Sequence, residues 1–85
     1  MKSVHTQQYS AFLALIIQAR KNANVTQQEL ADRLDKPQSY VSKYEHGERR
    51  LDFVEVIEIA ELIDLDPHEL IDKLRETSPT GGSSQ

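Results

Sequence analysis

Apolar residues recur every three or four positions in the first quarter of the chain. They are Tyr9, Phe12, Leu13, Ile16 and Ile17. This spacing places all five side chains on one face of a helix, and it predicts an amphipathic helix over residues 6–21. The polar run that follows, Asn22-Ala23-Asn24, ends the pattern.

Two short helices come next, and their terminal residues predict where each begins. Thr26 and Glu29 have the spacing of a capping box, in which each side chain accepts a hydrogen bond from the other residue's backbone N–H group. The second helix therefore begins at Thr26. It ends before Pro37, because a proline disfavours helical geometry in the preceding residue. The inner face of this helix consists of Leu30, Ala31 and Leu34.

Pro37 also suits the start of the third helix, where a missing N–H group costs nothing. This helix includes Val41 and Tyr44, and it ends at Gly47 because glycine favours the backbone geometry of a helix C-terminus. A turn of about three residues separates the second helix from the third, which is the arrangement of a helix-turn-helix.

The fourth helix is apolar over most of its girth. Between residues 52 and 63 the clearly polar positions are Glu55, Glu58 and Glu61, which form one stripe at a spacing of three residues. A core on one side would use about half of the remaining apolar side chains. The surplus leaves two interpretations: a central helix that is wrapped on several sides, or a helix that contacts another subunit.

A fifth helix is predicted to start at Pro67, because Asp66 is a good cap residue, proline suits the first helical position and Glu69 adds an acid at the third. Its inward residues are Leu70, Ile71 and Leu74. After Arg75 the chain has no large apolar residue, so residues 76–85 cannot offset their ordering entropy. We therefore expect an all-α domain over residues 1–75 and a disordered tail over residues 76–85.

Composition narrows the function classes. The chain has 85 residues and no cysteine, which bounds one small domain and excludes a disulfide scaffold, a cysteine-ligated zinc site and a thiol nucleophile. Its three histidines, His5, His46 and His68, are not at metal-ligand spacing. We expect no enzymatic activity, metal, cofactor or small-molecule ligand. A membrane segment and a signal peptide are also not expected, which favours a soluble cytoplasmic protein.

Charge is distributed unevenly along the chain. The formal net charge is −4, yet residues 1–50 contain eight bases and five acids, whereas residues 51–85 contain two bases and nine acids. Such asymmetry is typical of a protein whose first half faces a polyanion, although ordinary surface scatter gives the same numbers.

Several residues at fixed offsets then indicate a family. They are Arg20, the run Thr26-Gln27-Gln28-Glu29-Leu30-Ala31 and the run from Gln38 to Arg50. Residues from about 12 to 70 thereby resemble the lambda-repressor/Cro-like (XRE) family of DNA-binding proteins. The sequence departs from the family pattern at Asp35, where the turn often has glycine, but aspartate tolerates left-handed geometry better than most residues. The resemblance implies a five-helix lambda-repressor-like helix-turn-helix domain that binds double-stranded DNA.

By this resemblance, Gln38, Ser39 and Lys43 are the residues that read base edges in the major groove. Ser42 is expected on the same face of the third helix. Glutamine pairs in a bidentate manner with adenine and lysine donates to guanine, and a good bidentate pair contributes about 1 to 3 kcal/mol of discrimination. Without the resemblance, the same residues describe an ordinary polar, solvated face.

Phosphate contacts are expected around these base readers. Gln27 lies at the N-terminus of the second helix, where exposed N–H groups and the helix dipole favour an anion, and the resemblance implies the same role. Each of the other candidates has the alternative of being a plain surface residue. They are Thr26, Lys36, Tyr40, His46, Arg49 and Arg50.

Arg20 and Glu45 have a different implied role. The family pairs the matching positions in a buried or half-buried ion pair that links the first helix to the third, and it orients the third helix without touching bases. Tyr44, next to Glu45 in the chain, is expected to be a core aromatic whose hydroxyl reaches the surface, near a phosphate.

Together these features predict a sequence-specific transcriptional regulator, a repressor that binds a palindromic operator as a homodimer. Dimer contacts are expected on the fourth helix, at Val54, Ile59 and Leu62. The alternative is an antitoxin-like or other protein-binding module, in which the apolar fourth helix contacts a partner protein and DNA binding is secondary.

Overall fold

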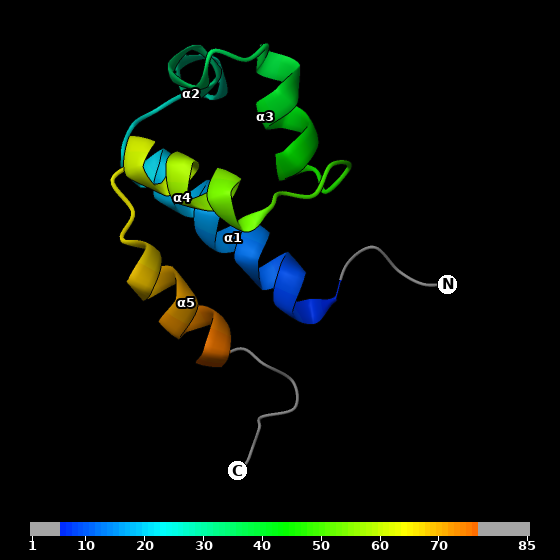
Figure 1. Ribbon diagram of the computed structural model, residues 1–85, viewed down its shortest axis with the longest axis vertical. Coiled ribbons are helices and arrows are strands. Elements are labelled where there is room, and N and C mark those ends of the chain that lie inside the picture. Colours follow the sequence, from blue (N-terminus) through cyan, green and yellow to red (C-terminus); the bar gives the residue numbers. More distant parts are fainter. Residues whose placement is uncertain (1–5, 77–85) are drawn as a thin grey trace.

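The protein folds into five α-helices joined by short connections, seen in a computed structural model that describes residues 6–76 (Figure 1). They are α1 (Gln7–Asn22), α2 (Gln27–Leu34), α3 (Gln38–Glu45), α4 (Phe53–Leu62) and α5 (Pro67–Glu76). Residues 6–76 contain no strand, which confirms the predicted all-α class. Each helix begins and ends within one or two residues of its predicted position.

Helix α5 ends at Glu76, one residue later than predicted. Glu76 is therefore helical, which corrects the predicted start of the tail. The remainder of the predicted disordered tail, residues 77–85, lies outside the described residues.

Side-chain capping boxes fix the starts of α2 and α4. Thr26 and Glu29 form the predicted capping box at α2, with both hydrogen bonds present. A second capping box, not anticipated from the sequence, joins Asp52 and Glu55 at α4. Each box satisfies two backbone N–H groups that would otherwise lack a partner in the first helical turn.

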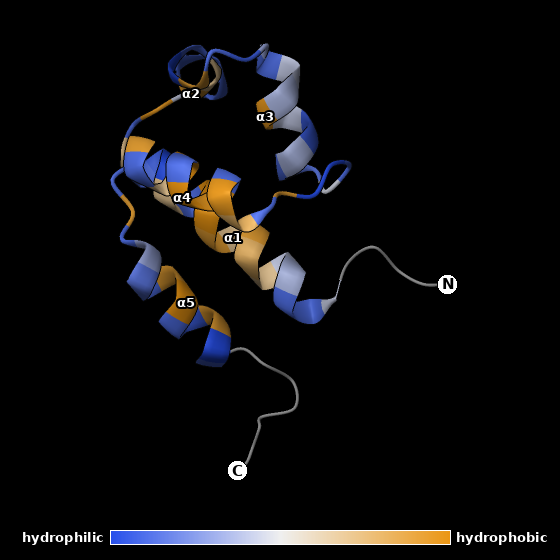
Figure 2. Ribbon diagram, in the orientation of Figure 1, coloured by the Kyte–Doolittle hydropathy of each residue, from blue (hydrophilic) through white to orange (hydrophobic). Residues whose placement is uncertain are grey.

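One hydrophobic core is shared by all five helices (Figure 2). The predicted inner residues of α2 are buried, as are Val41 and Tyr44 of α3. The largest side chains with almost no exposed surface are Tyr44, Ile16, Leu30, Ile59, Ile63 and Val41. Because these come from α1, α2, α3, α4 and the residue after α4, the core fixes the helices relative to one another.

The packing order separates two ends of the molecule. Helix α2 packs against α3 and α4, and α5 packs against α1 and α4. Figure 1 accordingly shows α2 and α3 at one end and α5 at the other. The Gln8 amide donates to the Leu74 carbonyl at 3.0 Å, and Arg33 donates to the Leu62 carbonyl at 3.0 Å. The outer face of α3 is thereby left at one end of the molecule.

Candidate nucleic-acid interface

The turn between α2 and α3 depends on a left-handed residue. Asp35 has φ 60° and ψ 44°, and its N–H group donates to the carbonyls of Ala31 and Asp32. Aspartate is among the few residues other than glycine that adopt this geometry readily. Pro37 then precedes α3 as its N-cap in an extended conformation. The sequence thus forms the tight turn without the glycine that the family often has.

The outer face of α3 presents polar side chains, whereas its inner face is core. Gln38, Ser39 and Lys43 are exposed and Ser42 is half-buried, while Val41 on the opposite face is fully buried. The Gln38 amide nitrogen donates to the Gln27 side-chain oxygen at 2.7 Å. Gln38 still has its carbonyl oxygen and one amide hydrogen for another partner.

A chain of hydrogen bonds continues from Gln27 into the interior. The Gln27 amide nitrogen donates to the Glu45 carboxylate at 2.8 Å. Arg20 pairs with the same carboxylate through Nε at 2.7 Å and Nη2 at 3.0 Å, and its Nη1 donates to the Val25 carbonyl at 2.9 Å. The Arg20 and Glu45 side chains are only 9% and 5% exposed. The ion pair that the resemblance implied is therefore present, and it is bidentate and buried.

This network joins three helices to the exposed face. Arg20 comes from α1, Gln27 from α2 and Glu45 and Gln38 from α3. Charge-assisted, bidentate pairs have a narrow geometry, so the network fixes the orientation of α3 and of the Gln38 side chain. The sequence indicated the ion pair and a phosphate role for Gln27, but it did not reveal that Gln27 bridges Glu45 to Gln38.

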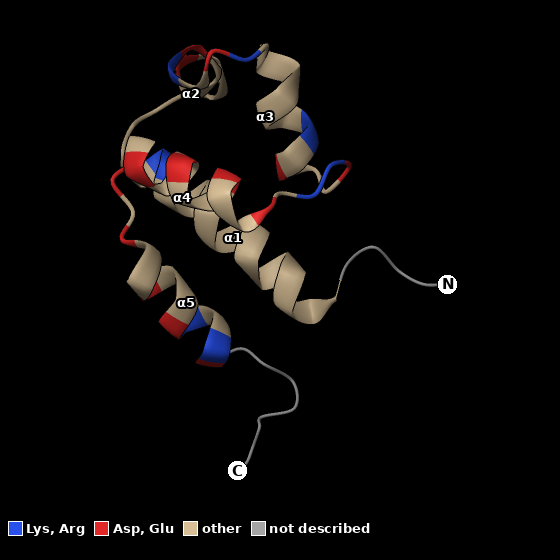
Figure 3. Ribbon diagram, viewed as in Figure 1, with Lys and Arg blue, Asp and Glu red and all other residues tan. Residues whose placement is uncertain are grey.

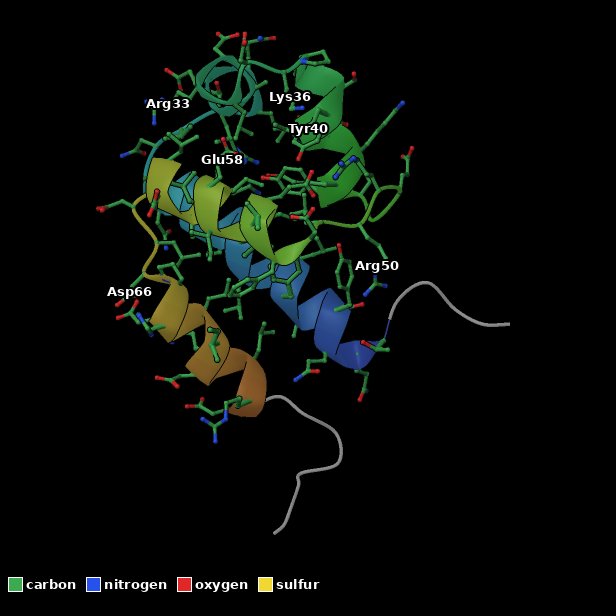
Figure 4. The ribbon with its side chains drawn as sticks, in the orientation of Figure 1. Arg33, Lys36, Tyr40, Arg50, Glu58 and Asp66 are labelled. Carbon is green, nitrogen blue, oxygen red and sulfur yellow. The ribbon has the colours of Figure 1, made fainter. Side chains whose placement is uncertain are left out.

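Basic residues flank α3 (Figure 3). Lys36 precedes it, and its Nζ lies 5.4 Å from the centre of the Tyr40 ring; the two residues are labelled in Figure 4. Arg50, in the loop after α3, stacks on the Tyr9 ring at 4.0 Å. Lys43 is exposed within α3 itself. Basic residues therefore precede, belong to and follow α3 in the chain.

Arg49 and Tyr40 both contact a carboxylate that the sequence analysis did not select. Arg49 donates to Glu55 at 2.8 and 3.2 Å, and it also lies 4.8 Å from the centre of the Tyr40 ring. The Tyr40 hydroxyl donates to the same carboxylate at 3.3 Å. The signal that could have revealed Glu55 is its position three residues after the cap residue Asp52.

The remaining predicted phosphate contacts lie near helix ends. The Thr26 hydroxyl is exposed and accepts from the Glu29 N–H group at 3.0 Å. His46 follows α3, and its Nδ1 lies 2.8 Å from the Ser42 carbonyl oxygen, so Nδ1 is the ring atom that donates. Both residues lie beside the exposed face of α3, at the start of α2 and the end of α3 respectively.

The predicted dimer residues divide into surface and core. Val54 is 73% exposed and Leu62 is half-buried, whereas Ile59 is fully buried. Ile59 therefore belongs to the core and has no surface for a subunit contact, which corrects its assignment. The sequence analysis missed Phe53, which is 68% exposed because the first turn of α4 extends beyond the core.

A groove of about 300 Å³ lies next to Phe53, between the starts of α1 and α4 and the length of α5. Its apolar lining includes Tyr9, Phe12, Val56 and Leu74. Ile71, predicted to point inward, is a partly exposed member of the same lining. The apolar surplus of the fourth helix is thus divided between the core and an exposed apolar surface at its N-terminal end.

Comparison with known proteins agrees with this arrangement. A helix-turn-helix family model matches residues 16–70, which is more than half of the chain. The chain belongs to the XRE-type helix-turn-helix family. Among solved structures, it is similar to an XRE-family like protein from Pseudomonas syringae pv. tomato str. DC3000, with 47% sequence identity and a TM-score of 0.80, over 85% of this chain and 88% of that one. No curated protein matches the chain.

Membership of the XRE-type family points to a transcription regulator that binds double-stranded DNA, and this family is not typically enzymatic. Within residues 6–76, the structure has no group of three or more His, Asp or Glu residues able to hold a metal ion. No helix in the described part of the chain is both long and apolar enough to cross a membrane.

Proposed function

We propose that the protein is a sequence-specific transcriptional repressor that binds a palindromic operator as a homodimer. The observation that carries this proposal is the exposed face of α3, where Gln38 is held by Gln27 and, through it, by the buried Glu45 and Arg20 pair. A side chain that is already oriented loses little conformational entropy on binding. Hydrogen bonds to base edges depend on direction, so they require a side chain that is oriented in this way.

In this proposal the face of α3 reads bases. Gln38 pairs with adenine through its free amide hydrogen and carbonyl oxygen, and Lys43 donates to guanine acceptors. Ser39 and Ser42 extend the contact along the groove, because a serine hydroxyl can form a hydrogen bond with either type of base. Each good bidentate pair contributes about 1 to 3 kcal/mol of discrimination.

Backbone phosphates are held on both sides of α3. Thr26 and Gln27 lie at the N-terminus of α2, where the helix dipole favours an anion. The flanking contacts come from residues before, within and after α3 that are basic or can donate a hydrogen bond. They are Lys36, Tyr40, His46, Arg49 and Arg50.

The homodimer would form through the first turn of α4. Phe53 and Val54 are large, apolar and exposed, and they lie beside the apolar groove. Two copies related by a two-fold axis would present two α3 helices to half-sites about 34 to 36 Å apart. A dimer bound over a promoter excludes polymerase, which is how repression would arise.

A partner protein is the second candidate for the same apolar surface, as in an antitoxin-like module. The exposed Phe53 and Val54 favour this candidate as well, because exposed apolar side chains that lie together mark protein contacts in general. Sedimentation of the pure protein separates the two, since a homodimer forms without any partner. A monomer at all concentrations would favour the partner protein.

The experiment that tests DNA reading is selection of bound duplexes from a random library at low and moderate salt. We expect an inverted repeat with half-sites about one helical turn apart. Gln38→Ala should lose preference at one position of each half-site, whereas Arg50→Ala should weaken binding to all sequences equally. Recovery of no motif, with binding that vanishes as salt rises, would contradict sequence-specific reading.

A further inference from the structure

Arg49 and Glu55 form an ion pair at the edge of the proposed DNA interface. Arg49 belongs to the loop after α3 and Glu55 to the first turn of α4, and two Arg49 nitrogens reach the Glu55 carboxylate. Tyr40 of α3 contacts both residues, through its hydroxyl and its ring. The cation that the sequence assigns to a DNA phosphate therefore already has an anion.

The Glu55 carboxylate is held in place independently of Arg49. It accepts a hydrogen bond from the Asp52 backbone N–H group at 2.9 Å as part of the α4 capping box. The hydrogen bonds from Arg49 and from Asp52 lower the pKa of Glu55 to about 2. Glu55 thus stays ionised at neutral pH, and protonation does not release Arg49 there.

The pair is also accessible from solvent. The Arg49 side chain is 42% exposed and the Glu55 side chain 23% exposed. A pair of this kind contrasts with Arg20 and Glu45, which are sealed in the interior. Because water reaches the pair, the pair contributes little to the free energy of folding. Another anion can therefore displace the carboxylate from Arg49.

We propose that Glu55 is an intramolecular competitor of DNA phosphate for Arg49, so that it limits how strongly the protein holds the DNA backbone. This inference rests on the proposed DNA-binding function. When DNA approaches, the guanidinium exchanges one carboxylate for one phosphate and no net cation is gained. Non-specific affinity for DNA comes from cations that neutralise phosphates. This affinity is then lower than the number of lysine and arginine side chains near α3 indicates.

The test is Glu55→Gln, measured as the dissociation constant for a short mixed-sequence DNA duplex over a series of salt concentrations. Glutamine also serves at this position of a capping box, so the start of α4 is preserved. The variant should bind roughly five- to tenfold more tightly at about 0.1 M salt. The slope of log affinity against log salt should steepen by about 0.9, the value for one more neutralised phosphate, because no released carboxylate then offsets the Arg49 charge.

Two controls separate this mechanism from a general change in charge. Glu48→Gln removes an exposed carboxylate from the same loop. Within the described structure, Glu48 forms no salt bridge with a lysine or arginine. The double variant Arg49→Ala/Glu55→Gln, compared with Arg49→Ala, removes the cation for which Glu55 and DNA phosphate compete. A gain for Glu55→Gln that exceeds the gain for Glu48→Gln and disappears without Arg49 supports the proposal. A gain that matches Glu48→Gln, or that persists without Arg49, overturns it.

The outcomes also distinguish this inference from the proposed function. If the original protein binds the duplex and Glu55→Gln, folded by circular dichroism, does not bind it more tightly, only the role of Glu55 is overturned. If neither protein binds any duplex, including the products of the library selection, the DNA-binding function fails and the role of Glu55 fails with it.

Discussion

The α2–α3 end and the first turn of α4 expose different kinds of side chain, held in different ways. At the α2–α3 end, Gln38 is polar and reaches the buried Glu45 and Arg20 pair through Gln27. In the first turn of α4, Phe53 and Val54 are apolar and exposed. Hydrogen bonds depend steeply on direction, whereas apolar burial depends on area. The first surface is therefore suited to reading a pattern of donors and acceptors, and the second to association.

The largest expected effect concerns the buried pair behind the polar surface. Glu45→Ala should lower the free energy of unfolding by about 3 to 5 kcal/mol, because it leaves the Arg20 charge buried without its partner. Chemical denaturation measures this loss. Arg20→Ala/Glu45→Ala should lose less than the sum of the single variants, since no isolated charge remains. A loss below about 1 kcal/mol for Glu45→Ala would remove the contrast with the exposed pair of Arg49 and Glu55.

A substitution in the apolar surface of the first turn of α4 should weaken association and leave the stability of the monomer almost unchanged. Val54→Ser should weaken the proposed dimer by about 1.5 to 3 kcal/mol for each side chain that the interface buries, while the stability of the monomer changes by less than about 0.5 kcal/mol because Val54 is 73% exposed. Sedimentation equilibrium measures the dissociation constant. Glu61→Gln, an exposed change on the same helix, is the matched control. An unchanged dissociation constant for Val54→Ser would exclude the first turn of α4 from the interface.

A smaller effect is expected from pH. The folded pKa of Glu55 is about 2, below its ordinary value of 4.5, owing first to the hydrogen bond from Arg49 and then to that from Asp52. Because this pKa is lowered in the folded state, ionised Glu55 stabilises the fold above about pH 4.5. This contribution to stability is lost as the pH falls from about 4.5 toward 2. Exposed pairs contribute up to about 1 kcal/mol.

Glu55→Gln should therefore make the free energy of unfolding less dependent on pH between about 5 and 2. Denaturant titrations of both proteins at a series of pH values measure this difference. Part of the dependence should persist, because hydrogen bonds from Thr26 also lower the pKa of Glu29. Identical curves for the two proteins would contradict the assigned coupling between Arg49 and Glu55.

The smallest effect is expected at Tyr44, in the core behind the polar surface. Its hydroxyl is buried and has no hydrogen-bond partner in the described structure, and burial raises the pKa of Tyr44 far above its ordinary value. Tyr44→Phe should leave stability within about 0.5 kcal/mol or increase it, because no hydrogen bond is lost. Thermal unfolding detects the change. A loss above about 1 kcal/mol would mean that the hydroxyl has a partner, such as a bound water.

Local residue patterns were enough to determine the helices, the turn and most of the core. Capping at Thr26, the proline before α3 and the spacing of Leu30, Ala31 and Leu34 act over a few residues, so they can be read directly from the chain. The pattern also indicated the partners Arg20 and Glu45, through the family resemblance. It placed Ile59 on the wrong side of its helix, because α4 is apolar on nearly every face.

Tertiary structure decided which other polar groups meet. Gln27 lies 18 residues from Glu45, and Tyr40 lies 15 residues from Glu55, so no local pattern pairs them. Packing of α2 against α3 brings Gln27 within hydrogen-bond distance of Glu45, and α2 also packs against α4, to which Glu55 belongs. The same packing leaves the first turn of α4 outside the core, and this is why Phe53 is exposed while Ile59 is buried. Sequence determined the helices because caps and periodicity are local, and the fold determined the site because its contacts are not.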